Sequence, residues 1–238
     1  MLKAVFFDLD GSLLPMNEPK FVAKFAHLIN VKLANKGYNY DELNQAFWDA
    51  TITVYKNDGS KLNFDLFWEY LANRFGEKIL EEKATIEDYY NNEFRTVKSE
   101  FYPNPLAKEI VKFVKDNNLL CILATQPIFP LIGVLNRMDF VGLEESDFDF
   151  ITNSENFRFA KMNPKYYKDL LDKFNLKGEE VIMFGNHSYE DGESSLANNI
   201  KTYLIEGCIV LDPKSTHEFE TVKMDEIIST IKKHINLP

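Results

Sequence analysis

Two carboxylates separated by one residue, Asp8 and Asp10, stand at the end of the first apolar segment of the chain. Residues two apart in an extended segment point the same way, so both carboxylates can address one ligand. Gly11 follows them and permits a sharp backbone turn. Neighbouring carboxylates repel each other unless a metal ion or a shared proton offsets their charge. The pattern therefore indicates a chemical site rather than a simple acidic turn.

Further along the chain, other polar residues that could take part in catalysis follow apolar segments or precede a helix start. Thr125 follows the apolar run 122–124, and Asn186 and Asp191 follow the run 181–184. Lys161 precedes Pro164, which is typical of a helix start. Each feature alone has a plain structural explanation, such as a solvated lysine or an acidic helix start. Taken one by one, these features do not establish a shared site.

The elements that must position these residues are predicted from short apolar runs. Such runs, bounded by polar or turn residues, are typical of buried parallel strands, and they occur at 3–7, 119–124, 148–151, 181–184 and 201–205. Helical patterns follow the start signals at 104–105 and 163–164. The alternation predicts an α/β fold with a doubly wound, mostly parallel, Rossmann-like sheet. Ligands of such sheets bind at the carboxyl ends of the strands.

Residues 18–98 differ, because they show one helical pattern after another and no convincing strand. The apolar stripe 64–75 ends at Gly76, where a helix C-cap is expected, and Asn39 with Glu42 resembles a capping box. Another stripe covers 21–33, and a fourth helix is predicted from Ile86, Tyr90, Phe94 and Val97. Four such helices predict a small bundle. We therefore expect a core domain of residues 1–15 and 101–238 and an inserted all-helical cap domain of residues 16–100.

The segment 8–13 resembles the first motif of the haloacid dehalogenase (HAD) superfamily, Asp-x-Asp-Gly-Thr/Ser-Leu. Segments 122–126, 161–164 and 181–191 are similar to its second, third and fourth motifs, in that order. Asp8 and Thr125 are 117 residues apart, whereas a simple βαβ unit needs roughly 30, and the surplus matches the C1-type cap of this family. In the third motif the resemblance favours Lys161 over Lys165. In the fourth motif Asn186 replaces the usual aspartate.

The resemblance implies a phosphatase that acts on a small phosphorylated metabolite. Asp8 would be the nucleophile that forms an aspartyl phosphate, and Asp10 the general acid and base. Thr125 and Lys161 would hold the phosphoryl oxygens, helped by substrate-binding groups of Leu9, Gly11, Ser12 and Gln126. The cofactor would be Mg²⁺, with ligands from Asp8, Asp10, Asn186 and Asp191. A phosphosugar mutase and a non-catalytic protein with this fold remain alternatives. The dehalogenases of the family generally lack a carboxylate at the position of Asp10, so the resemblance favours phosphoryl transfer over dehalogenation.

Composition limits the possible partners. The formal net charge of −10 disfavours nucleic acid as a partner, because polyanions need a basic surface. No apolar run is long enough for a membrane span, and the N-terminus lacks the pattern of a secretory signal, so a cytoplasmic location is expected. The two cysteines, Cys121 and Cys208, give no support to a disulfide framework. A monomer and a homodimer are equally compatible with the sequence.

Overall fold

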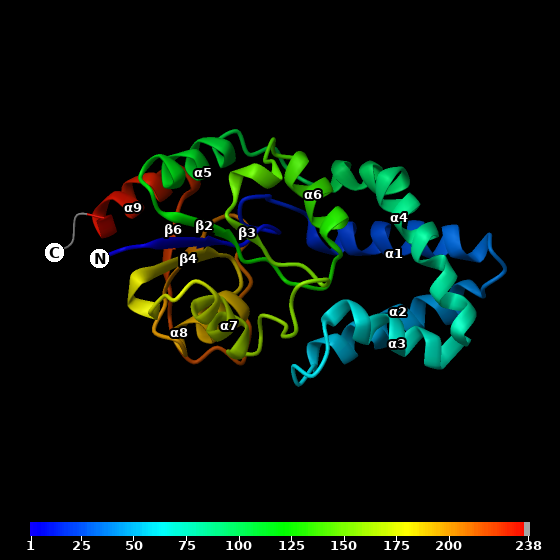
Figure 1. Cartoon of the computed structure of the whole chain (residues 1–238). Helices are drawn as coiled ribbons and strands as arrows, with labels where there is room; N and C mark the ends of the chain where they lie inside the picture. The colour runs from blue at the N-terminus through cyan, green and yellow to red at the C-terminus, as the bar shows by residue number, and fades with distance from the viewer. Residues whose placement is uncertain (236–238) are drawn as a thin grey trace.

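The computed structural model describes residues 1–235 and contains a six-stranded sheet in which every pairing is parallel. The spatial order is β3-β2-β1-β4-β5-β6, so β1 lies in the middle between β2 and β4 (Figure 1). The strands are β1 (Ala4–Phe7), β2 (Leu120–Leu123), β3 (Phe150–Ile151), β4 (Val181–Gly185), β5 (Lys201–Ile205) and β6 (Glu220–Val222). The doubly wound parallel sheet predicted from the sequence is confirmed.

Helices cover both faces of the sheet, as the alternation of strand side chains requires. Val5 and Phe7 pack with residues of α5 (Ala107–Asp116), α6 (Leu131–Asp139) and α9 (Ile227–Ile235). Ala4 and Phe6 point to the other face and pack with α7 (Lys165–Lys173). The short helix α8 (Ser194–Leu196) lies beside α7 on that face (Figure 1). Both faces of the strands are therefore buried, which explains their continuous apolar runs.

The segment between β1 and α5 is helical, as predicted. It contains α1 (Glu18–Ala34), α2 (Tyr40–Tyr55), α3 (Asn63–Phe75) and α4 (Lys83–Asn91), with 3₁₀ helices at Glu77–Glu82 and Glu93–Glu100. Asn39 caps α2 by accepting a hydrogen bond from the Glu42 N–H at 3.0 Å, and Gly76 ends α3 with φ +82°. The two ends of the segment meet where the Asn17 N–H donates to the Glu100 carbonyl at 2.9 Å. The helical segment is thus inserted through one paired connection.

Three details differ from the sequence-based expectation. The predicted fourth helix is two pieces, because the Asn92 side chain donates to the Asp88 carbonyl at 3.0 Å and the Asn92 backbone leaves helical geometry. The apolar residues of the helical segment contribute to two clusters. Those of α1 and α4 belong mainly to the cluster that covers the sheet and those of α2 and α3 mainly to another, with Phe47 and Ile86 packed against both. The short strand β6 has no apolar run and was not predicted.

The division into a core of residues 1–15 and 101–238 and a cap of residues 16–100 stays a prediction. Among the described residues, no helix has both the length and the apolarity needed to cross a lipid bilayer.

Candidate active site

The carboxyl ends of three neighbouring strands bring the predicted site residues together. Phe7 of β1 is in register with Leu123 of β2 and with Phe184 of β4. The chain leaves the sheet just after these positions, at Asp8, Thr125 and Asn186. A cleft of about 850 Å³ opens there and is lined by Asp8, Asp10, Gly11, Thr125, Gln126, Lys161, Asn186 and Asp191. One cavity therefore collects residues from all four motifs of the sequence.

A buried ammonium group lies between two carboxylates at the bottom of the cleft. Lys161 Nζ lies 2.8 Å from Oδ1 of Asp8 and also contacts Oδ1 of Asp191. The lysine is 1% exposed, and the two carboxylates raise its pKa above the usual value despite the burial. Burial raises the pKa of Asp8 to about 7, although Lys161 opposes this shift. Lys161 is therefore held as a cation beside the predicted nucleophile, whereas Lys165 is exposed at the start of α7.

The other oxygen atoms of these carboxylates are also held. Oδ2 of Asp191 accepts the backbone N–H groups of Asn186 and His187, each at 2.9 Å. Asp191 lies in a π-helical turn, Ser188–Glu193, and such turns are frequent at functional sites. Ser12 Oγ donates to Oδ2 of Asp8 at 3.0 Å. Both side chains consequently have fixed orientations toward the cleft.

Gly11 permits the close approach of the first and fourth motifs. Its φ is +77°, and a Cβ atom at this position would come within 2.3 Å of Nδ2 of Asn186. That Asn186 amide donates to the Cys208 carbonyl at 2.8 Å, and its Oδ1 faces the Ser12 hydroxyl at 3.3 Å. The amide therefore turns its oxygen toward Asp8 and its nitrogen away from it.

Several groups that were predicted to bind phosphoryl oxygens have no partner within residues 1–235. Thr125 Oγ1 is buried and makes no hydrogen bond there. The backbone N–H groups of Leu9 and Gln126 likewise have no acceptor in this part of the chain. The Leu9 side chain is fully buried, so only its backbone can meet a ligand. An anion in the cleft would satisfy such free donors.

Two residues of the site were not predicted from the sequence. The first is Arg137 of α6, whose Nε lies 3.0 Å from Oδ1 of Asp10. The second is Glu190, which accepts a hydrogen bond from Gln126 Nε2 at 2.8 Å and whose pKa burial raises to about 7. Gln126 also accepts the Lys161 N–H at 2.9 Å, so its side chain supports the loop around the lysine. A charged residue within the apolar face of 131–138 was the available signal for Arg137.

The oxygen donors of the cleft are compatible with a magnesium ion. Ser12 Oγ lies within 3.3 Å of both Asp8 Oδ2 and Asn186 Oδ1, so these two oxygens lie close together, beside Asp191. Within the described chain, no group of three or more His, Cys, Asp or Glu side chains is arranged to hold a metal. A metal here would therefore need the Asn186 amide oxygen and water or phosphate oxygens as ligands in addition to the carboxylates. This suits Mg²⁺, which usually keeps several water molecules and binds through one or two carboxylates and phosphate.

Comparison with known proteins gives consistent matches. A family model described as haloacid dehalogenase-like hydrolase matches residues 2–193. Glyceraldehyde 3-phosphate phosphatase of Pyrococcus furiosus is 26% identical over 194 residues, which cover 80% of this chain and 75% of the relative.

Solved structures with this fold include proteins of different activities. A putative beta-phosphoglucomutase from Thermotoga maritima has a TM-score of 0.58 at 22% identity and covers 98% of this chain and 99% of its own. A 2-haloacid dehalogenase from Pseudomonas syringae pv. Tomato has a TM-score of 0.63 at 14% identity, with the same coverage of 98% and 99%. At such identities the likeness establishes the fold, and the activity must be argued from the site.

Proposed function

Because the chain belongs to the haloacid dehalogenase-like hydrolases, we propose that it is a Mg²⁺-dependent phosphatase that hydrolyses a small phosphorylated metabolite through an aspartyl phosphate on Asp8. The observation that carries the proposal is the buried Lys161 ammonium, 2.8 Å from Asp8 and in the same cleft as the Thr125 hydroxyl, which has no partner within residues 1–235. Phosphoryl transfer depends on fixed positive charge and donors around the phosphoryl oxygens. A small phosphorylated substrate is also supported by the similarity to a glyceraldehyde 3-phosphate phosphatase.

The reaction has two steps. In the first, a carboxylate oxygen of Asp8 bonds to phosphorus, the bond from phosphorus to the ester oxygen breaks, and Asp10 gives a proton to the departing alcohol oxygen. In the second, Asp10 takes a proton from a water molecule whose oxygen bonds to phosphorus. The bond between Asp8 and phosphorus then breaks, and inorganic phosphate leaves. Together the two steps return Asp8 and Asp10 to their starting states.

The other residues bind and orient the phosphoryl group. Lys161, the Thr125 hydroxyl and the backbone N–H groups of Leu9 and Gln126 would bind its oxygens, and Gly11 and Ser12 keep the loop that carries Asp8 close to the site. A magnesium ion held by Asp8, the Asp10 carbonyl, Asn186 and Asp191 would neutralise phosphate charge.

The phosphatase is favoured over a phosphosugar mutase by the charges around the cleft. Within residues 1–235, Lys161 is the one lysine or arginine that lines it, and Glu18 and Glu190 add negative charge. A second phosphate group on the same sugar would therefore lack a basic partner. The carboxylate of Asp10 supports hydrolysis of an ester over dehalogenation, because an ester leaving group requires a proton.

The test is release of phosphate from phosphosugars, nucleotides, phosphorylated acids and glyceraldehyde 3-phosphate with Mg²⁺. The change Asp8→Asn should lower the rate roughly a thousandfold or more, because it removes the nucleophile. Asp172→Asn is the matched control, since Asp172 is an exposed partner of Lys168. A mutase would instead produce an isomeric sugar phosphate. If Asp8→Asn releases phosphate as fast as the wild type, the proposed mechanism is wrong.

A further inference from the structure

A second cavity, of about 340 Å³, lies within the helical segment among α1, α2, α3 and α4 and the loops at 128–130 and 154–155. Its volume is within the range of small-molecule sites, roughly 300–1,000 Å³. The wall is largely aromatic and includes Phe25, Phe47, Trp48, Phe64, Phe67 and Trp68. We propose that this cavity receives the alcohol part of the substrate, so that the preferred substrates are phosphate monoesters of an uncharged, largely apolar alcohol. This inference rests on the proposed phosphatase function.

The cavity adjoins the catalytic cleft. The residues Phe25, Trp48, Thr51, Ile128 and Phe129 line both spaces. The rings of Phe25 and Phe129 meet edge to face with centroids 5.2 Å apart, so they form an apolar border between the two. Because the two spaces share these residues, an ester whose phosphoryl group lies at Asp8 would place its alcohol part in the cavity by passing beside this pair of rings.

The charges along this path favour an uncharged alcohol. In the described part of the chain, Lys83 is the one lysine or arginine on the cavity wall, and it is an exposed residue with its Nζ 5.3 Å from the Phe64 ring centroid. Glu87 and Glu155 also line the cavity, and both are exposed. A second anionic group would thus meet carboxylates and an ammonium group that already faces aromatic rings. An apolar group instead gains free energy by leaving water for this wall.

Two residues that line the cavity each have a buried polar atom without a partner within residues 1–235. Asn30 is 1% exposed and Ser154 is 3% exposed, and neither Oδ1 of Asn30 nor Oγ of Ser154 makes a hydrogen bond there. The Asn30 amide nitrogen donates to Asn44 at 3.0 Å, so only its oxygen is free. Buried polar atoms of this kind are costly unless a ligand or water bonds them.

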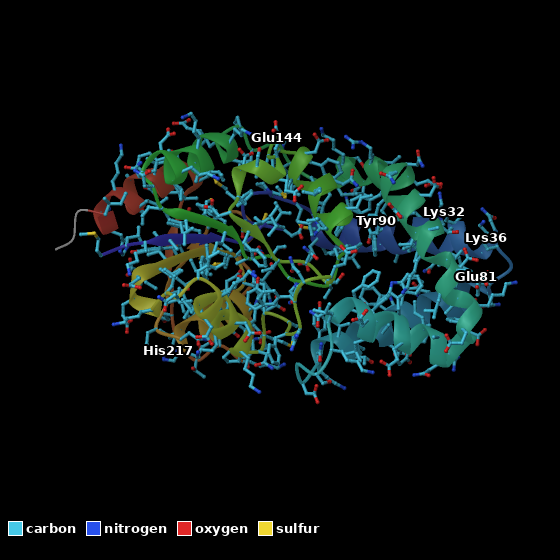
Figure 2. All side chains as sticks on the ribbon, viewed as in Figure 1. Lys32, Lys36, Glu81, Tyr90, Glu144 and His217 are labelled. Carbon is cyan, nitrogen blue, oxygen red and sulfur yellow. The ribbon has the colours of Figure 1, made fainter. Side chains whose placement is uncertain are left out.

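The walls of the cavity are anchored on both sides. At the start of α3, the Phe64 N–H donates to the Ser154 carbonyl at 2.8 Å, and Asn63 Nδ2 donates to the Pro127 carbonyl at 3.0 Å. On the other side, Asn136 Nδ2 of α6 donates to the Tyr90 carbonyl at 3.0 Å. Figure 2 shows Tyr90 in the interior where α4 approaches α6, far from Lys36 and Glu81 at the outer end of the helical segment. The cavity is therefore bounded by fixed backbone, which favours a preformed site.

The first test is a series of alkyl phosphates from ethyl to octyl. We expect kcat/KM to rise roughly fourfold for each added methylene until the cavity is filled, because each buried methylene transfers from water to an apolar wall. Binding is measured separately with hexyl phosphate and the Asp8→Asn variant, which avoids turnover. Trp48 lines both spaces, whereas Trp68 lines the cavity and not the cleft. The chain has no other tryptophan, so in Asp8→Asn combined with Trp48→Phe the fluorescence should change on binding of hexyl phosphate and not of glycerol phosphate.

The second test fills the cavity. Ala26 of α1 lines it and is half-buried, whereas Ala23 on the same helix is exposed and is not part of the wall. Ala26→Leu should lower kcat/KM for hexyl phosphate at least tenfold while ethyl phosphate changes less than twofold. Ala23→Leu should leave both unchanged.

The outcomes separate this inference from the proposed function. If Asp8→Asn abolishes hydrolysis but the alkyl series is flat and Ala26→Leu changes nothing, the apolar alcohol site is wrong and the phosphatase stands. If the wild type hydrolyses no ester, the phosphatase is wrong, and the fluorescence titration decides the site. A response to hexyl phosphate that Ala26→Leu weakens then supports an apolar ligand site, and an absent response overturns it.

Discussion

Arg137 Nε lies 3.0 Å from Oδ1 of Asp10, in an ion pair without hydrogen-bond alignment. The arginine is fully buried, and its guanidinium carbon lies 4.0 Å from the Phe129 ring centroid. Its side-chain nitrogens have no hydrogen-bond partner within residues 1–235. A buried cation is costly without such bonds, so its place behind the proposed general acid indicates a role in positioning Asp10.

Replacement of Arg137 by Met should separate catalysis from stability. We expect kcat to fall roughly 10- to 100-fold, a part of what general acid–base catalysis contributes, because Asp10 loses its neighbouring charge. Tm should stay unchanged or rise, because the Arg137 cation has no hydrogen bonds within residues 1–235 and its partner Asp10, whose side chain is 25% exposed, would not be left as a buried charge. Steady-state kinetics and thermal unfolding measure the two effects.

The matched control for Arg137→Met is Arg74→Met, because Arg74 is exposed and pairs with the exposed Glu42 at 3.2 Å. That change should affect neither kcat nor Tm appreciably. Arg137→Lys should recover part of kcat, since it restores the charge. Unchanged kcat in Arg137→Met would show that the ion pair has no part in catalysis.

Gly11→Ala should destabilise the protein by more than backbone strain alone. A left-handed φ costs a residue with a Cβ roughly 1–2 kcal/mol, and here the Cβ would also come within 2.3 Å of Asn186 Nδ2. Gly37→Ala is the control, because Gly37 has φ +99° with no atom within 4 Å of the added Cβ. Denaturant unfolding of both variants measures the difference, and equal losses would refute the steric contact.

Asn186→Asp should strengthen Mg²⁺ binding and lower the stability of the metal-free protein. A carboxylate adds charge to the ligand set but cannot donate to the Cys208 carbonyl, which now accepts from Asn186 at 2.8 Å. Leaving that carbonyl without its donor should cost about 1–3 kcal/mol. We expect a lower half-saturating Mg²⁺ concentration and a lower Tm without metal. An unchanged or higher half-saturating concentration would mean that the amide does not limit metal affinity.

Binding of Mg²⁺ should depend on pH through Asp8. Burial raises the pKa of Asp8 from 3.8 to about 7 in the metal-free protein, so below this pH a proton competes with the metal. The metal-free native state binds more protons than the unfolded state between these values, so its stability falls as pH rises through them. Mg²⁺ affinity should rise roughly tenfold from pH 6 to pH 8.

Calorimetric titration in buffers of different ionisation enthalpy would measure both this affinity and the proton released. Asp8→Asn should remove the part of this pH dependence that comes from Asp8, and adding Glu190→Gln should remove most of the rest, because burial also raises the pKa of Glu190 to about 7. Equal affinity at pH 6 and pH 8 in the wild type would show that Asp8 is already ionised in the metal-free site.

Local patterns accounted for most of the fold. The apolar runs of β1, β2 and β4 and the caps at Asn39 and Gly76 are set by neighbouring residues, and the structure has them where the sequence predicts. The break at Asn92 was missed because a helical apolar spacing continues across it, while a side-chain hydrogen bond ends the helix. The strand β6 was missed because it depends on pairing with β5 rather than on an apolar run.

The sequence by itself determined which residues leave the ends of the strands, because strand ends and motif order are local properties of the chain. Asp8 was identified in this way, and Thr125, Lys161 and Asp191 were identified by their resemblance to the motifs of the family. Only the tertiary structure decided what surrounds them: Arg137 beside Asp10, and an aromatic cavity beside the cleft. These relationships join side chains from distant segments, and helical spacing does not distinguish a ring that faces a cavity from one that faces another helix.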